Sequence, residues 1–221
     1  MDLNLDGNPL MTLAIAPGSD TAIPLHVVEE STLDDWLTSQ DDATRPWVAT
    51  QGFTGAIGQA LCLPDTQGAP RLALAGYGTP TKRRRSRFAL AAAAARLPKG
   101  TYTIASGLDA ETQQIEALGW LLAAYRFERY KSQSPMLAQL QANEALNIDR
   151  ITALANGEAL TRTLINTPAS DMGPPDLEQA ARDLAQTHGA ELDVIVGDAL
   201  LEQHFPLIHT EGRAADRAPR L

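Results

Sequence analysis

Along the first 130 residues, stretches whose apolar residues have the spacing of a strand alternate with stretches that have the spacing of a helix. Short β-branched or alternating apolar stretches, bounded by Gly and Pro, predict strands. These predicted strands cover residues 11–16, 23–28, 47–53, 56–64, 71–78 and 101–107. Helical patterns separate several of them. Strands that alternate with helices predict an α/β fold with a mostly parallel or mixed sheet.

Three helical patterns belong to this part of the chain. Residues 31–40 predict a short helix with Ser31 as its N-cap. Residues 87–97 are nearly all Ala and Leu, which favour helices. Asp109 is placed to cap a third helix that runs to about Tyr130. The apolar face predicted for this third helix consists of Ile115, Leu118, Leu122 and Tyr125.

The next segment changes character. Residues 131–143 are polar and interrupted by Pro135, which predicts a connector or an edge segment. A helix over about residues 151–165 follows, and then the loop NTPASDMGPP. Pro175 opens another helix at the first-turn position that proline tolerates, and Gly189 ends it. The stripe predicted to be buried on this helix is Leu177, Ala180, Ala181 and Leu184.

The chain closes with a predicted strand over residues 192–197 and a short helix that Asp198 caps. We therefore expect two parts, an N-terminal α/β domain at residues 1–140 and a linker with an incomplete second domain at residues 141–221. The second part has one clear strand and buries little apolar surface. Its apolar faces predict more sheet than this chain supplies.

Composition narrows the class of protein. Hydrophobic residues make up 44% and charged residues 20%, as in soluble globular proteins. The net charge of −9 argues against nucleic acid as the main partner. The single cysteine, Cys62, cannot form an internal disulfide, which fits a reducing cytoplasm. The N-terminus lacks a signal-peptide pattern, and no stretch approaches the roughly 20 apolar residues of a membrane span.

Three segments resemble the leucine aminopeptidase (cytosol aminopeptidase) family of two-metal exopeptidases. Residues 119–131, GWLLAAYRFERYK, resemble the last helix of the family's N-terminal domain. The matching positions there are Tyr125, Phe127, Tyr130 and Lys131. Residues 161–177 resemble the entry to the catalytic domain, where an Asn-Thr-Pro turn precedes a Met-Gly-Pro turn. Residues 205–221 resemble the stretch before the family's first metal-binding strand.

The resemblance implies a fold and an activity. The N-terminal part would be a mixed-sheet unit similar to macro domains, followed by the opening helices and strand of an α/β catalytic domain. The complete protein would be a cytoplasmic hexamer that uses two divalent ions, Zn or Mn, to release N-terminal residues from peptides. The family's metal ligands and catalytic residues come from motifs resembling VGKGxxFDxGGxxxK and NTDAEGR, and neither occurs here. The resemblance therefore assigns no catalytic, cofactor-binding or metal-binding residue, and we expect this chain alone to be inactive.

One short segment shares three letters with the second motif but lacks a residue that the motif needs. Residues 210–213, TEGR, share the letters EGR with it. The motif needs an Asp two places before its Glu, and here that residue is His209. We therefore interpret Glu211 and Arg213 as part of the upstream segment, without a catalytic role.

The remaining candidates for metal binding are also weak. The four histidines have neither HxH nor HxxxH spacing, so the sequence favours surface or loop positions. They are His26, His188, His204 and His209. The acidic pairs Asp34-Asp35 and Asp41-Asp42 are predicted to be solvated surface. Neither a GxSxG elbow nor a GxxxxGK[ST] loop is present.

A basic run stands out against the acidic average. It comprises Lys82, Arg83, Arg84, Arg85 and Arg87 in the segment GYGTPTKRRR and just after it. Cations at a helix N-terminus oppose the helix dipole, so helix stability does not explain the run. A solvated turn, pairing with acidic residues of the same or a neighbouring subunit, phosphate binding at the Gly-rich turn and nucleic-acid contact all stay open.

Two further functions stand beside the peptidase hypothesis. The N-terminal part would bind a nucleotide, another anion or DNA, as its macro-like character and basic run allow. Alternatively, it would have a structural role in packing against the catalytic part and in oligomer assembly.

Overall fold

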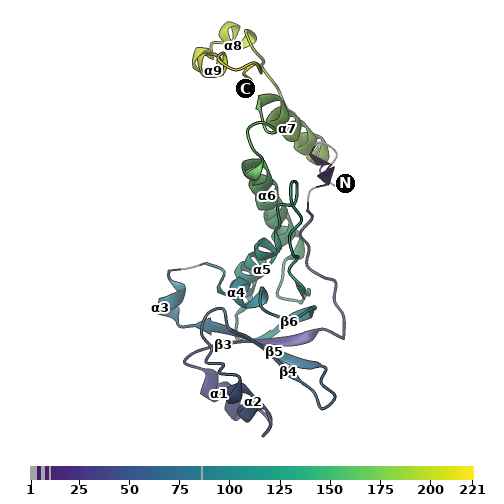
Figure 1. The fold of residues 1–221 in the computed structure, drawn as a ribbon, viewed down its shortest axis with the longest axis vertical. Coiled ribbons are helices and arrows are strands. Elements are labelled where there is room, and N and C mark those ends of the chain that lie inside the picture. Colours follow the sequence, from purple (N-terminus) through teal and green to yellow (C-terminus); the bar gives the residue numbers. More distant parts are fainter. Residues whose placement is uncertain (1–3, 6–7, 10, 86) are drawn as a thin grey trace. The chain divides into compact units, whose positions relative to one another are not determined.

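The computed structural model describes residues 4–5, 8–9, 11–85 and 87–221 (Figure 1). The chain forms two compact units. The first unit comprises residues 13–128 and 132–159. The second comprises the described residues up to Thr12, residues 129–131 and residues 160–221. None of the described helices has the length and apolar character that crossing a membrane requires.

A mixed sheet of five strands forms the centre of the first unit, which confirms the predicted α/β class. In spatial order the strands are β4 (Ala60–Pro64), β5 (Pro70–Gly78), β3 (Ile23–Glu29), β6 (Gly100–Ser106) and β7 (Ala138–Leu140). β5, β3, β6 and β7 are parallel to one another, whereas β4 pairs with β5 in the antiparallel sense. The predicted connector at residues 131–143 therefore contains an edge strand.

Helices cover both faces of this sheet (Figure 1). The helices of the first unit are α1 (Leu33–Thr38), α2 (Thr44–Thr50), α3 (Pro80–Arg83), α4 (Ala89–Ala94), α5 (Ala110–Ala124) and the start of α6 (Ile148–Asn166). Because side chains alternate along a strand, Leu25 and Val27 pack on the face that α4 and α5 cover. Val28 packs on the other face, with Val48 of α2.

Three strand predictions in this unit need correction. Residues 47–53 are not a strand, because α2 covers residues 44–50. The Asp41 carboxylate accepts the N–H of Thr44, and Pro46 lies in the first turn, where proline is tolerated. Residues 11–16 contain no strand either, since Ala16 forms only an isolated bridge to Gln141. The strand predicted over residues 56–64 is confined to β4.

The predicted helices are present, but their boundaries and buried faces differ from the prediction. Asp109 caps α5, with its carboxylate 2.7 Å from the N–H of Thr112, as predicted. The helix ends at Ala124 rather than near Tyr130. Ile115 is half exposed, whereas Trp120 is buried. Packing of α5 against α4 and the core buries an arc that is shifted from the predicted face and centres on Ala117, Trp120 and Leu121.

Two N-terminal helix predictions also change. α1 begins after Thr32 rather than after Ser31, and neither side chain forms a capping hydrogen bond to it. The predicted helix over residues 87–97 is shortened to α4. Phe88 precedes α4 with φ of 60°, a conformation that breaks the helix there.

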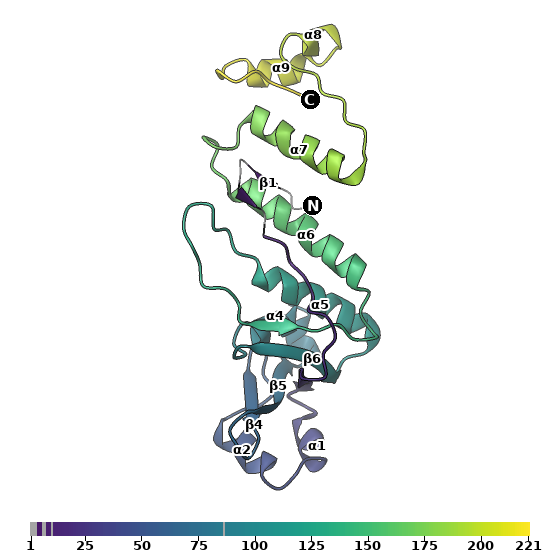
Figure 2. The ribbon, with the colours of Figure 1, turned by 90° about the vertical axis from the view of Figure 1, so that its right-hand side faces the viewer.

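The second unit is mainly helical. Its elements are β1 (Asn4–Leu5), β2 (Asn8–Pro9), the last turns of α6, α7 (Pro174–His188), α8 (Ala199–Glu202) and α9 (Pro206–Gly212). α8 and α9 pack against each other, as Figure 2 shows near the C-terminus. Pro174 and Pro175 occupy the first turn of α7, and Gly189 ends it with φ of 64°, both as predicted.

Two expectations for this unit are wrong. Residues 192–197 form no strand; Ile195 instead exchanges two backbone hydrogen bonds with Leu221, of 2.9 and 3.0 Å. The predicted buried stripe of α7 is largely open, because Leu177 is 53% and Leu184 38% exposed, while Ala180 is buried. Within the described residues, the apolar stripe of α7 is only partly covered.

Candidate functional site

The Asn-Thr-Pro turn links α6 to α7 in the second unit. Thr167 is buried, and its hydroxyl donates to the carbonyl of Thr163 at 2.7 Å. The N–H groups of Asp171 and Met172 both donate to the carbonyl of Pro168 at 2.9 Å. The Tyr130 hydroxyl donates to the carboxylate of Asp171. These contacts give the turn a defined shape.

Arg217 reaches this turn from the C-terminal segment. Its guanidinium lies 3.1 Å from the Asp176 carboxylate and donates to the carbonyl of Ala169 at 3.0 Å. A Cβ added to Gly173 would stand 2.1 Å from the Arg217 Nη1, so a larger residue there would displace the guanidinium from its present position. The same Asp176 carboxylate accepts the N–H of Gly173 at 2.8 Å. Arg217 and Asp176 together hold the start of α7.

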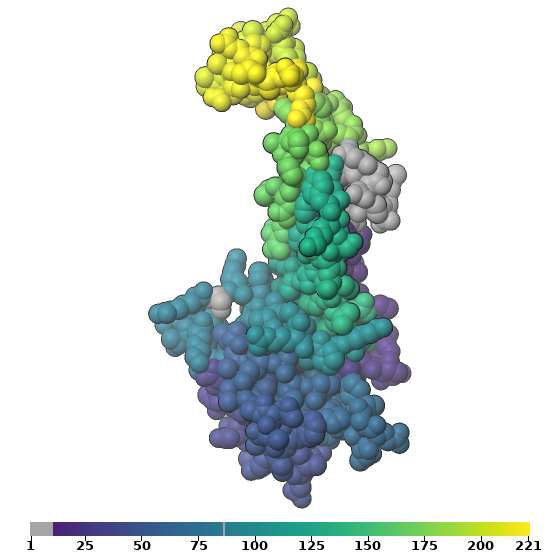
Figure 3. Space-filling model, in the orientation of Figure 1, coloured from purple at the N-terminus to yellow at the C-terminus, as the bar shows by residue number. Residues whose placement is uncertain are grey.

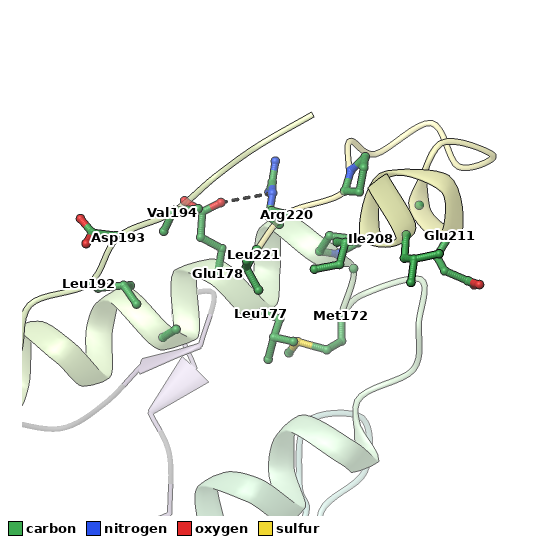
Figure 4. Close-up of a pocket in the computed structure, with 16 residues that line it drawn as sticks. Met172, Leu177, Glu178, Leu192, Asp193, Val194, Ile208, Glu211, Arg220 and Leu221 are labelled. Carbon is green, nitrogen blue, oxygen red and sulfur yellow. Dashed lines mark ion pairs between the residues drawn. The ribbon is translucent and has the colours of Figure 1, made fainter. Parts of the chain in front are cut away.

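A cavity of about 780 Å³ lies beside this turn (Figure 4). α7, α9 and the segments at residues 192–194 and 219–221 enclose it. Its apolar wall includes Met172, Leu177, Ala181, Leu192, Val194, Leu207 and Ile208. Leu207 is 79% exposed, so this wall is open to solvent in the described chain. No sequence pattern indicated this cavity, although the apolar stripe predicted for α7 contributes two of its residues.

One ion-pair network crosses the cavity wall. The Glu178 carboxylate lies 3.2 Å from the Arg220 Nε (Figure 4). The same carboxylate lies 2.7 Å from the Arg182 Nε. The Arg220 Nε is buried, and its contact with Glu178 is an ion pair without hydrogen-bond alignment. Glu211 also lines the cavity, and Arg213 follows α9 as an exposed residue.

The histidines are dispersed. His26 donates or accepts a 2.8 Å hydrogen bond with Ser106 in the first unit, and burial lowers the pKa of its imidazole. In the second unit His209 lies 3.1 Å from Asp198, His188 is in the last turn of α7, and His204 has φ of 67°. Among the described residues, no three His, Cys, Asp or Glu side chains are grouped to hold a metal ion. These residues therefore do not fit a two-metal centre.

The acidic pairs behave differently from each other. Asp34 and Asp35 are exposed on α1. Asp41 is a structural residue: hydrogen bonds from Thr44, and then Arg71, lower the pKa of its carboxyl to about 2. The Arg71 guanidinium lies 2.7 Å from this carboxylate and ties it to β5. Asp41 is exposed, as expected, and its carboxylate in addition links the start of α2 to β5.

The basic run pairs partly with acidic residues of the same unit. The Lys82 ammonium lies 2.7 Å from the Glu30 carboxylate, and Arg83 pairs with Glu29. The Arg83 guanidinium also stacks 4.2 Å from the centre of the Tyr77 ring. Arg84, Arg85 and Arg87 are exposed. The turn that carries them protrudes at the left of Figure 3.

The Gly-rich turn before the run has its own internal contacts. The Thr79 hydroxyl accepts the N–H of Lys82 at 3.3 Å and so caps the four-residue helix α3. Gly78 has φ of 65°. The capping hydroxyl takes one of the amide groups on which a phosphate would depend.

Family profiles match most of the chain. The profile of the M17 aminopeptidase N-terminal domain matches residues 23–142. The profile of the cytosol aminopeptidase family catalytic domain matches residues 159–221. The two matches follow one another in the order of the family's domains.

Similarity to individual proteins indicates the same family. A probable cytosol aminopeptidase of Wolinella succinogenes is 28% identical over 90% of this chain and 45% of its own length. One from a Picosynechococcus strain is 34% identical over 67% of this chain and 34% of its length. The crystal structure of the Coxiella burnetii cytosol aminopeptidase superposes with a TM-score of 0.84 at 31% identity, covering 94% of this chain and 45% of that one. The chain thus spans about half the length of such relatives, and it belongs to the M17 aminopeptidase family.

Proposed function

We propose that this chain is the N-terminal domain and the opening of the catalytic domain of a metal-dependent leucyl aminopeptidase. The observation that carries the proposal is the succession of two matches, at residues 23–142 and 159–221, to the two domains of one peptidase family. The complete protein would release N-terminal residues from peptides. We place the boundary between the domains near residue 140.

The open cavity of the second unit supports this proposal. Leu177 and Leu207 are 53% and 79% exposed although they line one apolar wall. Covering such a wall with further protein is favourable, at about 25 cal/mol for each Å² of apolar surface removed from water. We infer that the remaining sheet of the catalytic domain packs there.

Two divalent ions, Zn or Mn, would serve the complete enzyme by activating water and stabilising the tetrahedral intermediate. The described residues do not form a site that fits them. We therefore expect the ligands, the catalytic lysine and the catalytic arginine to come from motifs that this sequence does not contain. We also propose a cytoplasmic location and assembly as a homohexamer.

Leucine release from a leucyl chromogenic amide tests the proposal. The 221-residue chain, supplied with Mn²⁺ or Zn²⁺, should release no leucine above the rate of buffer with metal. The reading frame downstream of codon 221 should encode a GKGxxFDxGG-like strand within a few tens of residues. The polypeptide that includes this continuation should be active and should lose activity with a chelator. Metal-dependent release by the 221-residue chain would contradict the assignment of the active site.

A further inference from the structure

β3 and β6 are neighbours from which the chain leaves in opposite directions. After β3 it passes through α1 and α2 to β4 and β5, on one side of β3. After β6 it passes through α5 to β7, on the other side. In open α/β sheets, such a reversal leaves a crevice outside the carboxyl ends of the two strands, and ligands bind there.

A cleft of about 480 Å³ lies at this point. Its lining includes Val28, Glu29, Asp35, Trp36, Ser106 and Gly107. Pairing between β3 and β6 ends at His26 and Ser106, so the last residues of β3 continue without β6 beside them. Gly107 turns away with φ of 94°, and a Cβ there would stand 1.8 Å from the Val27 carbonyl oxygen. Glycine at this position therefore allows the close approach of the chain to the end of β3.

The cleft offers an aromatic face with polar groups around it. The Trp36 ring is held against His26, with ring centroids 5.5 Å apart. Asp35 is exposed, and none of the described hydrogen bonds or ion pairs engages its carboxylate. The Ser106 hydroxyl is held at 2.8 Å from His26. Together these groups provide a stacking surface, a free anionic acceptor and a hydroxyl.

The charges of the cleft disfavour the binding of a phosphate group. The two carboxylates in its lining are Glu29 and Asp35, and the lining contains no Lys or Arg. Glu29 is already paired with Arg83. Asp35 therefore presents an uncompensated negative charge, and a phosphate close to it would be repelled. Hydroxyl and amino donors, by contrast, form strong hydrogen bonds with a carboxylate.

We propose that this cleft binds an unphosphorylated nucleoside, whose base stacks on Trp36 and whose ribose hydroxyls donate to Asp35. The cleft volume lies within the ordinary range of small-molecule sites, roughly 300–1,000 Å³. This site is distinct from the peptidase function proposed above and does not depend on it. It differs from the nucleotide or anion site that the macro-like character led us to expect, because the cleft is acidic.

Calorimetric titration of the 221-residue chain with adenosine, AMP and ADP-ribose tests the proposal. Adenosine should bind, and AMP and ADP-ribose should bind at least about tenfold more weakly, which corresponds to about 1.4 kcal/mol. Asp35→Asn should weaken adenosine binding about tenfold. Asp34→Asn is the matched control, because Asp34 is exposed on the same helix but does not line the cleft. The affinity of the Asp34→Asn protein for adenosine should equal that of the unaltered chain.

Three outcomes would overturn the proposal. They are no heat of binding with adenosine, equal affinity of the Asp35→Asn and Asp34→Asn proteins, and tighter binding of AMP or ADP-ribose than of adenosine. Both substitutions are at exposed positions of α1, so both proteins should remain folded, which circular dichroism verifies. Loss of peptidase activity in a longer polypeptide would leave this result unaffected, so the two proposals fail separately.

Discussion

The carboxylate of Glu116 on α5 accepts a hydrogen bond of 2.8 Å from the Tyr77 hydroxyl of β5, inside the core of the first unit. Its second oxygen accepts the backbone N–H of Leu90 at 2.9 Å, in the first turn of α4. Phe88, which precedes α4, supplies no side-chain cap. Glu116 thus caps a neighbouring helix and ties it to the sheet.

Replacing Glu116 should therefore destabilise the first unit. Glu116→Leu leaves the Leu90 N–H and the Tyr77 hydroxyl without this acceptor, at a cost of about 1–3 kcal/mol for each buried group. Glu116→Gln keeps one acceptor oxygen and should cost less. Urea unfolding followed by circular dichroism measures both. Equal stability of the Leu variant and the unaltered protein would show that the buried carboxylate contributes nothing net.

The buried tyrosines predict a loss of stability at high pH. Burial, with a smaller contribution from Cys62, raises the pKa of Tyr102 to about 12. Burial and the Glu116 carboxylate raise the pKa of Tyr77 as well. Because a free tyrosine has a pKa of about 10, the unfolded chain releases these protons first. The stability that the two groups contribute is complete below about pH 10 and declines as pH rises towards 12.

Tyr102→Phe tests this dependence. The substitution should reduce the decline in unfolding free energy between about pH 10 and pH 11, measured in urea at several pH values. Absorbance at 295 nm should show the tyrosine fraction that ionises only on unfolding. An unchanged slope in the Phe variant would argue that Tyr102 titrates normally in the folded protein.

The carboxylate of Asp41 should make the stability of the protein decrease as the pH falls. The Asp41 carboxyl has a pKa of about 2, below the usual range of an aspartate, because hydrogen bonds from Thr44 and Arg71 stabilise its charged form. Its contribution is complete above about pH 4 and is lost as pH falls towards 2. Asp41→Asn should therefore flatten the acid limb of the stability profile. Asp42→Asn, at the exposed neighbouring position, is the control and should keep that limb.

Replacing Arg217 should loosen the structure locally, with little change in global stability. Its ion pair with Asp176 is partly exposed, so Arg217→Ala should change global stability by less than about 1 kcal/mol. Amide hydrogen exchange of residues 168–177 should nevertheless accelerate, because the turn loses the guanidinium contacts at Ala169 and Asp176. Arg213→Ala, at a nearby exposed position, should leave that exchange unchanged. Equal exchange in both variants would show that Arg217 does not hold the turn.

Local signals in the sequence were sufficient for several elements. The Asp109 cap, the proline start and glycine end of α7, and the strands β3, β5 and β6 all follow from residues within a few positions of each element. The turns around residues 161–177 likewise indicated the family that the profiles identify. These features depend on backbone geometry and capping, which neighbouring residues decide.

Contacts between distant residues decided the rest. Glu116 is 39 residues from Tyr77, and Arg217 is 41 residues from Asp176, so no periodicity links either pair. The cleft between β3 and β6 exists only because the order of strands reverses there. Apolar pattern and local capping are encoded along the chain, whereas the partner of a buried charge and the position of a cleft depend on which strands and helices become neighbours in space.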